Sequence, residues 1–246
     1  MGSDPILLAI DAGNTRIKWG VHDGKRFVAG GAVPTSEAAS LAQAWTDGPP
    51  AQRAIASNVA GPAVRAALES ACARTGIALE IIRSQAEQAG VRSGYADPAQ
   101  LGTDRWAALI AAHAGEPGDK VVANVGTALT IDALTADGRF LGGLIVPGPA
   151  LMRRSLDRGT ADLRLTEGEY RDFPRATPDA ITSGAINACV GAVQRMVAAM
   201  AAQGLAPGVV VLSGGAAGEL APHLPFDVAL RENLVLDGLV LIARAS

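Results

Sequence analysis

The chain has 246 residues, enough for one large domain or two small ones with a sizeable buried core. Its composition, with 49% hydrophobic residues, 29 glycines and only 4% aromatic residues, is typical of a compact α/β protein and excludes a disordered chain. A net charge of −3 argues against a basic nucleic-acid-binding surface, and the two cysteines, Cys72 and Cys189, lack the spacing of a disulfide framework or a zinc site.

No apolar stretch reaches the roughly 18 residues of a membrane span. The N-terminus also lacks the basic region and apolar core of a signal peptide. We therefore expect a cytoplasmic protein whose partners are small molecules, with no nucleic acid and no membrane among them.

The first half of the chain predicts three strands and then an alternation of helices and strands. The three strands cover residues 6–10, 15–21 and 26–33, and the turns between them carry DAGN and Asp23-Gly24. The alternating elements are a helix at 36–47, a strand at 53–59, a helix at 61–75, a strand at 78–83 and a helix that begins near Thr103.

The second half repeats this order. Residues 119–149 contain three strands, the last two joined by an Asp137-Gly138 turn, and helices at 149–157 and 177–203, a strand within 208–217 and a final helix at 233–244 follow. LLAIDAGNTRIKWG also aligns with VVANVGTALTIDAL. We therefore predict a duplicated α/β domain, divided into residues 1–116 and 117–246, with a nucleotide cleft between the copies.

Each copy carries a glycine just after its first strand. In the first copy, DAGNT, Gly13 would let backbone N–H groups approach a phosphate, and Asp11 could hold Mg²⁺ against phosphate oxygens. The alternative is an ordinary hairpin turn, in which Asp, Gly and Asn are frequent. Because Gly126 and Thr127 repeat the pattern after the matching strand, and two such loops can clamp a triphosphate, the pair favours nucleotide binding.

A third glycine cluster, LSGGAA, follows a strongly apolar strand. Gly214 and Gly215 would let an adenosine lie against the backbone. Strand-to-helix turns often contain glycine, so this cluster taken alone is a weak signal.

Six segments, in chain order, resemble the type III pantothenate kinases: IDAGNTRIKWG, YADPAQLGTDRWAAL, NVGTALTID, GGLIVPG, TPDAITSGA and LSGGAA. That family belongs to the acetate and sugar kinase, Hsp70 and actin superfamily, so the resemblance implies two actin-like ATPase domains of the ribonuclease H-like type. It also implies ATP-dependent phosphorylation of pantothenate to 4′-phosphopantothenate, the first step of coenzyme A biosynthesis. Bvg accessory factors resemble the same family, so the alternatives are a non-catalytic accessory or regulatory protein and a kinase of another small alcohol.

The resemblance assigns the role of general base to Asp104. A carboxylate in the first turn of a helix could accept the alcohol proton, although the helix dipole alone also favours an acid there. Arg105 would pair with the pantothenate carboxylate or a phosphate, the alternative being a surface salt bridge. The residues that match the family's substrate-binding positions are Tyr95, Gly102, Thr103, Asp104, Arg105 and Thr177.

Two further implications concern ATP and the subunit arrangement. The resemblance places Thr177 across a homodimer interface, where it reaches the neighbour's substrate. Lys18 would turn either toward phosphate or into solvent. The residues expected to bind ATP and its phosphates are Asp11, Gly13, Asn14, Thr15, Lys18, Gly126, Thr127, Gly214 and Gly215.

One position departs from the family's pattern. The second loop of the family commonly begins with Asp, whereas this chain has Asn124, which keeps an oxygen ligand but loses a charge. Family members use a monovalent cation, K⁺ or NH₄⁺, near that loop, so the cation site depends on Asn124. Asp132 is a candidate for the missing carboxylate, and Mg²⁺ is expected at Asp11.

Overall fold

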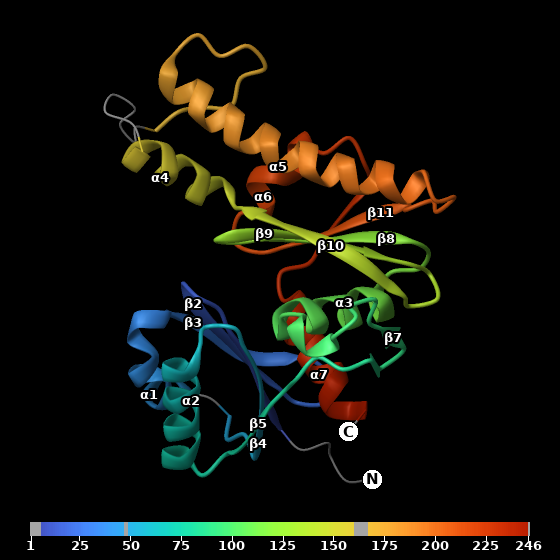
Figure 1. The fold of residues 1–246 in the computed structure, drawn as a ribbon. Helices are drawn as coiled ribbons and strands as arrows, with labels where there is room; N and C mark the ends of the chain where they lie inside the picture. Colours follow the sequence, from blue (N-terminus) through green and yellow to red (C-terminus); the bar gives the residue numbers. More distant parts are fainter. Residues whose placement is uncertain (1–5, 47–48, 160–166, 246) are drawn as a thin grey trace. The chain divides into compact units, whose positions relative to one another are not determined.

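The computed structural model describes residues 6–46, 49–159 and 167–245, and the chain divides into two compact units (Figure 1). The first unit consists of residues 1–115 together with 234–246, and the second of residues 116–233. The C-terminal helix α7 (Leu234–Ala245) thus belongs to the first unit, which differs from the predicted subdomain of residues 117–246.

The first unit is built on a five-stranded sheet with the order β3-β2-β1-β4-β5. Its strands are β1 (Leu7–Ala12), β2 (Arg16–His22), β3 (Phe27–Pro34), β4 (Arg53–Asn58) and β5 (Ala78–Ile81). β1 to β3 form an antiparallel meander, whereas β4 runs parallel to β1 and β5 parallel to β4. Because β1 is the central strand, its side chains are buried on both faces, which explains the unbroken apolar run at its start.

Helices cover both faces of this sheet (Figure 1). Leu8, Ile10 and Ala12 alternate along β1 and join the core beneath the helices of one face, while α7 packs on β1 and β4 with α3 against it. The predicted helix at 36–47 is a 3₁₀ turn followed by a short α-helix. The helical elements are η1 (Thr35–Ser40), α1 (Leu41–Thr46), α2 (Pro62–Thr75), η2 (Pro98–Gln100) and α3 (Thr103–Gly115), and a small hairpin, β6 (Glu87–Gln88) with β7 (Val91–Arg92), precedes η2.

The second unit repeats the sheet of the first. Its order is β10-β9-β8-β11-β12, with the same pattern of antiparallel and parallel pairs, and this confirms the predicted duplicated α/β fold. The short edge strand β12 lies in a segment for which the sequence predicts no strand. The strands are β8 (Lys120–Val125), β9 (Ala128–Leu134), β10 (Phe140–Pro147), β11 (Val209–Ser213) and β12 (Val228–Leu230).

The helical elements of this unit are α4 (Pro149–Gly159), α5 (Thr177–Ala201), α6 (Ala217–Leu220) and η3 (Ala221–His223). By length and composition α5 could cross a membrane. This differs from the sequence-based expectation of no apolar stretch of that length. Its buried side chains recur every three or four residues, as in Ile186, Cys189, Val193 and Met196, and they pack on the core of β8 and β9. The helix therefore serves as a core helix of this unit.

Candidate functional site

The first candidate phosphate loop is the turn between β1 and β2. The Gly13 N–H donates to the Arg16 carbonyl at 3.0 Å, and the Thr35 hydroxyl donates to the Gly13 carbonyl at 2.7 Å. Asn14 and Thr15 form the exposed tip. The loop is therefore a tight turn, braced from the end of β3, whose tip is open to solvent.

Asp11 precedes this turn at the end of β1. In the sheet register it lies opposite Lys18 on β2 and beside Ser57 on β4. Burial, and then the charge of Asp104, raise the pKa of Asp11 to about 7, while Lys18 opposes the shift. Directly paired residues of antiparallel strands share one face, so Lys18 is on the same side of the sheet as Asp11.

The charge that acts on Asp11 bears on metal binding. The Asp104 charge raises the pKa of the partly buried Asp11 carboxyl, and a cation at Asp11 would offset that effect. Within residues 6–46, 49–159 and 167–245 no group of three or more His, Cys, Asp and Glu side chains is placed to hold a metal. Mg²⁺ commonly binds through one or two carboxylates together with substrate phosphates, so this donor set fits a nucleotide-bound Mg²⁺.

Asp104 lies in the first turn of α3. Its Oδ1 accepts a hydrogen bond from the Arg105 N–H at 2.8 Å. Burial raises the pKa of Asp104, while that hydrogen bond and the Arg105 charge oppose the rise. A Cβ on Gly102 would lie only 2.6 Å from this Oδ1. The absence of a side chain at Gly102 is thus what allows the carboxylate to occupy its place at the start of the helix.

Arg105 is buried, with only 5% of its surface exposed. Its Nη1 donates to the Tyr95 hydroxyl at 3.0 Å, and its guanidinium lies 5.7 Å from the centroid of the Tyr95 ring. Because Arg105 is buried, it does not fit the alternative of a salt bridge at the protein surface. A buried guanidinium beside a phenol is instead suited to a carboxylate or phosphate.

One residue of this region carries no predicted role. Ser57, fully buried at the end of β4, shares a hydrogen bond of 2.8 Å between its Oγ and the Thr103 Oγ1. The second unit has a serine at the same place, because Ser213 pairs with Asn124 as Ser57 pairs with Asp11. That internal match between the two sequence halves is the signal that could have identified it.

The second candidate phosphate loop joins β8 and β9 and is built like the first. The Gly126 N–H donates to the Ala128 carbonyl at 2.9 Å, and the Gly148 N–H donates to the Thr127 carbonyl at 2.9 Å. A Cβ on Gly148 would lie 2.1 Å from the Gly126 carbonyl oxygen. The glycine after GGLIVP is therefore required for the end of β10 to approach this loop.

Asn124 lies close to the third glycine cluster. A Cβ on Gly214, whose φ is +99°, would lie 2.6 Å from the Asn124 Oδ1 and 2.4 Å from the Val125 carbonyl oxygen. Gly214 thus has a structural reason to be glycine, and two uncharged oxygens converge beside it. Thr130, and not Asp132, lies opposite Asn124, since Asp132 is buried further along β9 opposite Val122.

Thr177 is far along the chain from these residues and begins α5. It is exposed and lines a mainly apolar groove of about 540 Å³ between α4 and α5. Met152 and Leu156 line the groove from α4, and Ile181 and Ala185 from α5. The structure thus places Thr177 at the rim of a surface formed by the second unit.

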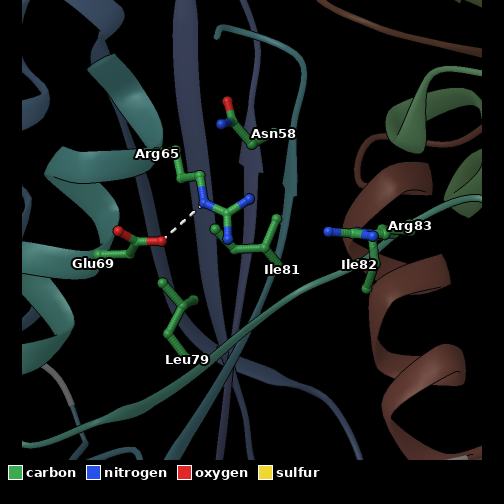
Figure 2. Close-up of a pocket in the computed structure, with 7 residues that line it drawn as sticks. All are labelled: Asn58, Arg65, Glu69, Leu79, Ile81, Ile82 and Arg83. Atoms are coloured by element: carbon green, nitrogen blue, oxygen red, sulfur yellow. Dashed lines mark hydrogen bonds and ion pairs between the residues drawn. The ribbon is translucent and has the colours of Figure 1, made fainter. Parts of the chain in front are cut away.

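A pocket of about 290 Å³ lies at the ends of β4 and β5 beside α2 (Figure 2). Figure 2 shows Arg65 and Glu69 among the residues that line it, with the Arg65 Nε paired to the Glu69 Oε1 at 2.9 Å. The Asn58 amide donates to the Gly61 carbonyl at 3.0 Å. The Arg65 Nε and the Asn58 amide thus have partners within the protein, and the lining residues include none of those predicted for the site.

A family model and the curated relatives of this chain carry the same description. A family model described as type III pantothenate kinase matches residues 7–199. A type III pantothenate kinase of Nitrosospira multiformis is 43% identical over 242 residues, covering 98% of this chain and 92% of the relative. That of Aromatoleum aromaticum is 46% identical over 240 residues, covering 97% of this chain and 98% of the relative.

Solved structures share the fold at low sequence identity. A Campylobacter jejuni protein described as a Baf family transcriptional activator has a TM-score of 0.60 and 20% identity, covering 96% of this chain and 97% of that one. A glucokinase from an Antarctic psychrotroph has a TM-score of 0.52 and 12% identity, covering 99% of this chain and 100% of that one. At such identities these structures show the fold alone.

Proposed function

The chain belongs to the type III pantothenate kinase family, and from this premise we propose that it transfers the γ-phosphate of ATP to the terminal hydroxyl of pantothenate, with Asp104 as general base. The product is 4′-phosphopantothenate, so the enzyme carries out the first step of coenzyme A biosynthesis. The observation that carries the assignment of the base is the placement of the Asp104 carboxylate in the first turn of α3, where its Oδ1 accepts a hydrogen bond from the Arg105 N–H at 2.8 Å.

Asp104 has the properties that the proton transfer requires. As the pantothenate oxygen bonds to the γ-phosphorus and the bond to ADP breaks, the hydroxyl proton passes to the Asp104 carboxylate. Burial raises the pKa of Asp104 and so makes it a stronger base than a solvated carboxylate. The Arg105 N–H and the glycine at 102 fix where its Oδ1 lies.

The ATP phosphates are assigned to the two loops. In the first loop the ligands are the backbone after Gly13, the side chains of Asn14 and Thr15 and the Lys18 ammonium. Gly126 and Thr127 supply the second loop, and Gly214 and Gly215 the adenosine contact. Asp11 would hold Mg²⁺ directly or through water, and the ion would neutralise charge on the phosphates.

The monovalent cation is assigned to the neighbourhood of Asn124. The Asn124 Oδ1 and the Val125 carbonyl oxygen approach the same side of Gly214. K⁺ is bound elsewhere by uncharged carbonyl oxygens, so an amide in place of a carboxylate keeps the chemistry while lowering the charge. We expect K⁺ or NH₄⁺ to bind here without help from Asp132.

The pantothenate carboxylate is assigned to Arg105 and Tyr95, with Gly102 and Thr103 beside them. Thr177 would complete the pocket of a neighbouring subunit in a homodimer. The apolar groove that Thr177 borders supports this arrangement, because such a surface is suited to contact with a second copy. We expect the enzyme to act in the cytoplasm.

A substrate panel tests the proposed function. The chain is supplied with ATP, Mg²⁺ and K⁺ together with pantothenate, glucose, N-acetylmannosamine or no acceptor, and ADP release and the phosphorus NMR spectrum are recorded. We expect ADP release and a new phosphate monoester in the reaction that contains pantothenate, and in none of the other three reactions. A sugar phosphate in place of phosphopantothenate would establish the kinase of another alcohol, and no turnover with any acceptor would favour the accessory protein.

A further inference from the structure

We propose that Ser57 is a positioning residue for the phosphoryl transfer, because its hydroxyl fixes the first residue of α3 to the end of β4. The inference rests on the proposed function, in which the neighbouring residue of α3, Asp104, is the general base. Ser57 itself has no assigned contact with pantothenate, ATP or the metal.

One end of this contact lies inside the sheet of the first unit. Ser57 is fully buried near the end of β4, a strand paired on one side with β1 and on the other with β5. In the register with β1 it lies directly beside Asp11. Its position is therefore set by the same sheet that sets the position of Asp11.

The other end of the contact is the start of α3, the helix that carries Asp104. Thr103 is the first residue of α3, and its Oγ1 lies 2.8 Å from the Ser57 Oγ. The two residues are 46 positions apart, so the bond joins a strand and a helix that are distant in the sequence. It ties the backbone that carries Asp104 to the strand beside Asp11.

Backbone hydrogen bonds also hold the turn before α3: the Leu101 N–H donates to the Pro98 carbonyl at 3.1 Å, and the Trp106 N–H donates to the Gly102 carbonyl at 3.0 Å. Gly102 can carry no side chain without meeting the Asp104 Oδ1, so no side chain from that position packs the turn in place. One residue earlier, the Ser84 hydroxyl holds the turn by donating a hydrogen bond to the Leu101 carbonyl at 2.8 Å. The contact between Ser57 and Thr103 is the corresponding bond on the helix side of Gly102.

A positioning bond has a characteristic kinetic effect. A displacement of roughly 1 Å at a reacting group can cost about 100-fold in rate. Loss of the bond through replacement of Ser57, which has no assigned substrate contact, should therefore lower kcat, while KM for both substrates stays close to the wild-type value. Loss of a direct substrate contact would instead raise KM.

The test is a double-mutant cycle with Ser57→Ala, Thr103→Val and the double variant. Each single variant is expected to lower kcat by about tenfold, and Ser57→Ala should keep KM for ATP and pantothenate within about twofold of the wild-type value. Because both substitutions break the same bond, the double variant should be no slower than the slower single variant. Ser70→Ala, at an exposed position of α2, is the matched control and should keep the wild-type kcat.

Multiplied losses in the double variant, or an unchanged kcat in Ser57→Ala, would overturn the inference. The carbon-13 resonance of the Asp104 carboxyl is measured in the same variants without substrate, so that the outcome does not depend on turnover. It should shift in Ser57→Ala and in Thr103→Val but not in Ser70→Ala, and an unmoved resonance would also overturn the inference. A wild-type enzyme that fails to phosphorylate pantothenate contradicts the proposed function instead.

Discussion

Two carboxylates dominate the chemistry at the residue scale. Asp11 lies near the end of a strand that is buried on both faces, and Asp104 lies in the first turn of a helix whose next eight residues are buried. Their burial is thus a consequence of the elements that carry them, and it raises the pKa of both groups. Lys18 lowers the pKa of Asp11 but does not cancel the effect, which is why a cation accompanying ATP fits beside it.

Replacing Gly102 tests how closely Asp104 is placed. In Gly102→Ala the new Cβ would lie 2.6 Å from the Asp104 Oδ1, so the carboxylate must move and lose its hydrogen bond from the Arg105 N–H. We expect kcat to fall by roughly 10- to 100-fold. Steady-state kinetics with pantothenate and ATP measures the change.

Gly115→Ala is the control for this substitution. Gly115 ends the same helix, and a Cβ there would meet no atom within 4 Å. This variant should keep the wild-type kcat. A Gly102→Ala enzyme as fast as Gly115→Ala would show that the carboxylate position does not limit the rate.

Local sequence patterns point to individual residues of the candidate site but not to how these residues pair. The acid in the first turn of α3 and the glycine turns follow from local patterns. Two pairings depend on strand register, which local patterns leave open: Lys18 opposite Asp11, and Ser57 beside Asp11. The hydrogen bond between Ser57 and Thr103 joins residues 46 positions apart, so local patterns leave it open as well. The buried pair of Arg105 and Tyr95 also depends on how a loop folds back on a helix.

At the element scale the first unit depends on how α3 and α7 pack. A Cβ on Gly238 would lie 1.9 Å from the Ala107 carbonyl oxygen, so the two helix backbones are in direct contact. The sequence predicts α7 as a helix from its apolar pattern. The pattern does not reveal which sheet the helix joins, so the predicted boundary places α7 in the second subdomain, whereas it packs in the first unit.

Gly238→Ala is therefore expected to destabilise the protein by about 1–3 kcal/mol, since the two helices must separate to admit the methyl group. Gly191→Ala, within α5 and with no atom within 4 Å of the added Cβ, is the control. The free energy of unfolding of Gly191→Ala should exceed that of the wild type by no more than about 1 kcal/mol. Urea unfolding gives both values, and a Gly238→Ala protein as stable as Gly191→Ala would contradict the packing.

At the scale of the whole molecule the chain is a duplication with unequal halves. Both units have the same strand order, and both close their glycine turn with a hydrogen bond from the glycine N–H. Asp11 corresponds to Asn124, and Lys18 to Thr130. The first unit thus carries the charged groups suited to Mg²⁺ and phosphate, and the second carries uncharged oxygens suited to a monovalent cation.

Mixing two impaired variants tests the proposed homodimer. If Thr177 completes a neighbour's pocket, a Thr177→Ala subunit paired with an Asp104→Asn subunit has one intact site. After the two proteins are mixed and allowed to exchange, activity at low pantothenate should rise to about a quarter of the wild-type value. Activity equal to the sum of the separate variants, or a fully active monomer by light scattering, would contradict the shared pocket.

The central claim is that Asp104 is the general base of a pantothenate kinase. The measurement is kcat for pantothenate-dependent ADP release by Asp104→Asn, with Asp227→Asn, at an exposed position before β12, as the matched control. The account predicts a fall in kcat of roughly 10²- to 10⁴-fold for Asp104→Asn and none for Asp227→Asn. An Asp104→Asn enzyme that turns over at the rate of the Asp227→Asn control would contradict it.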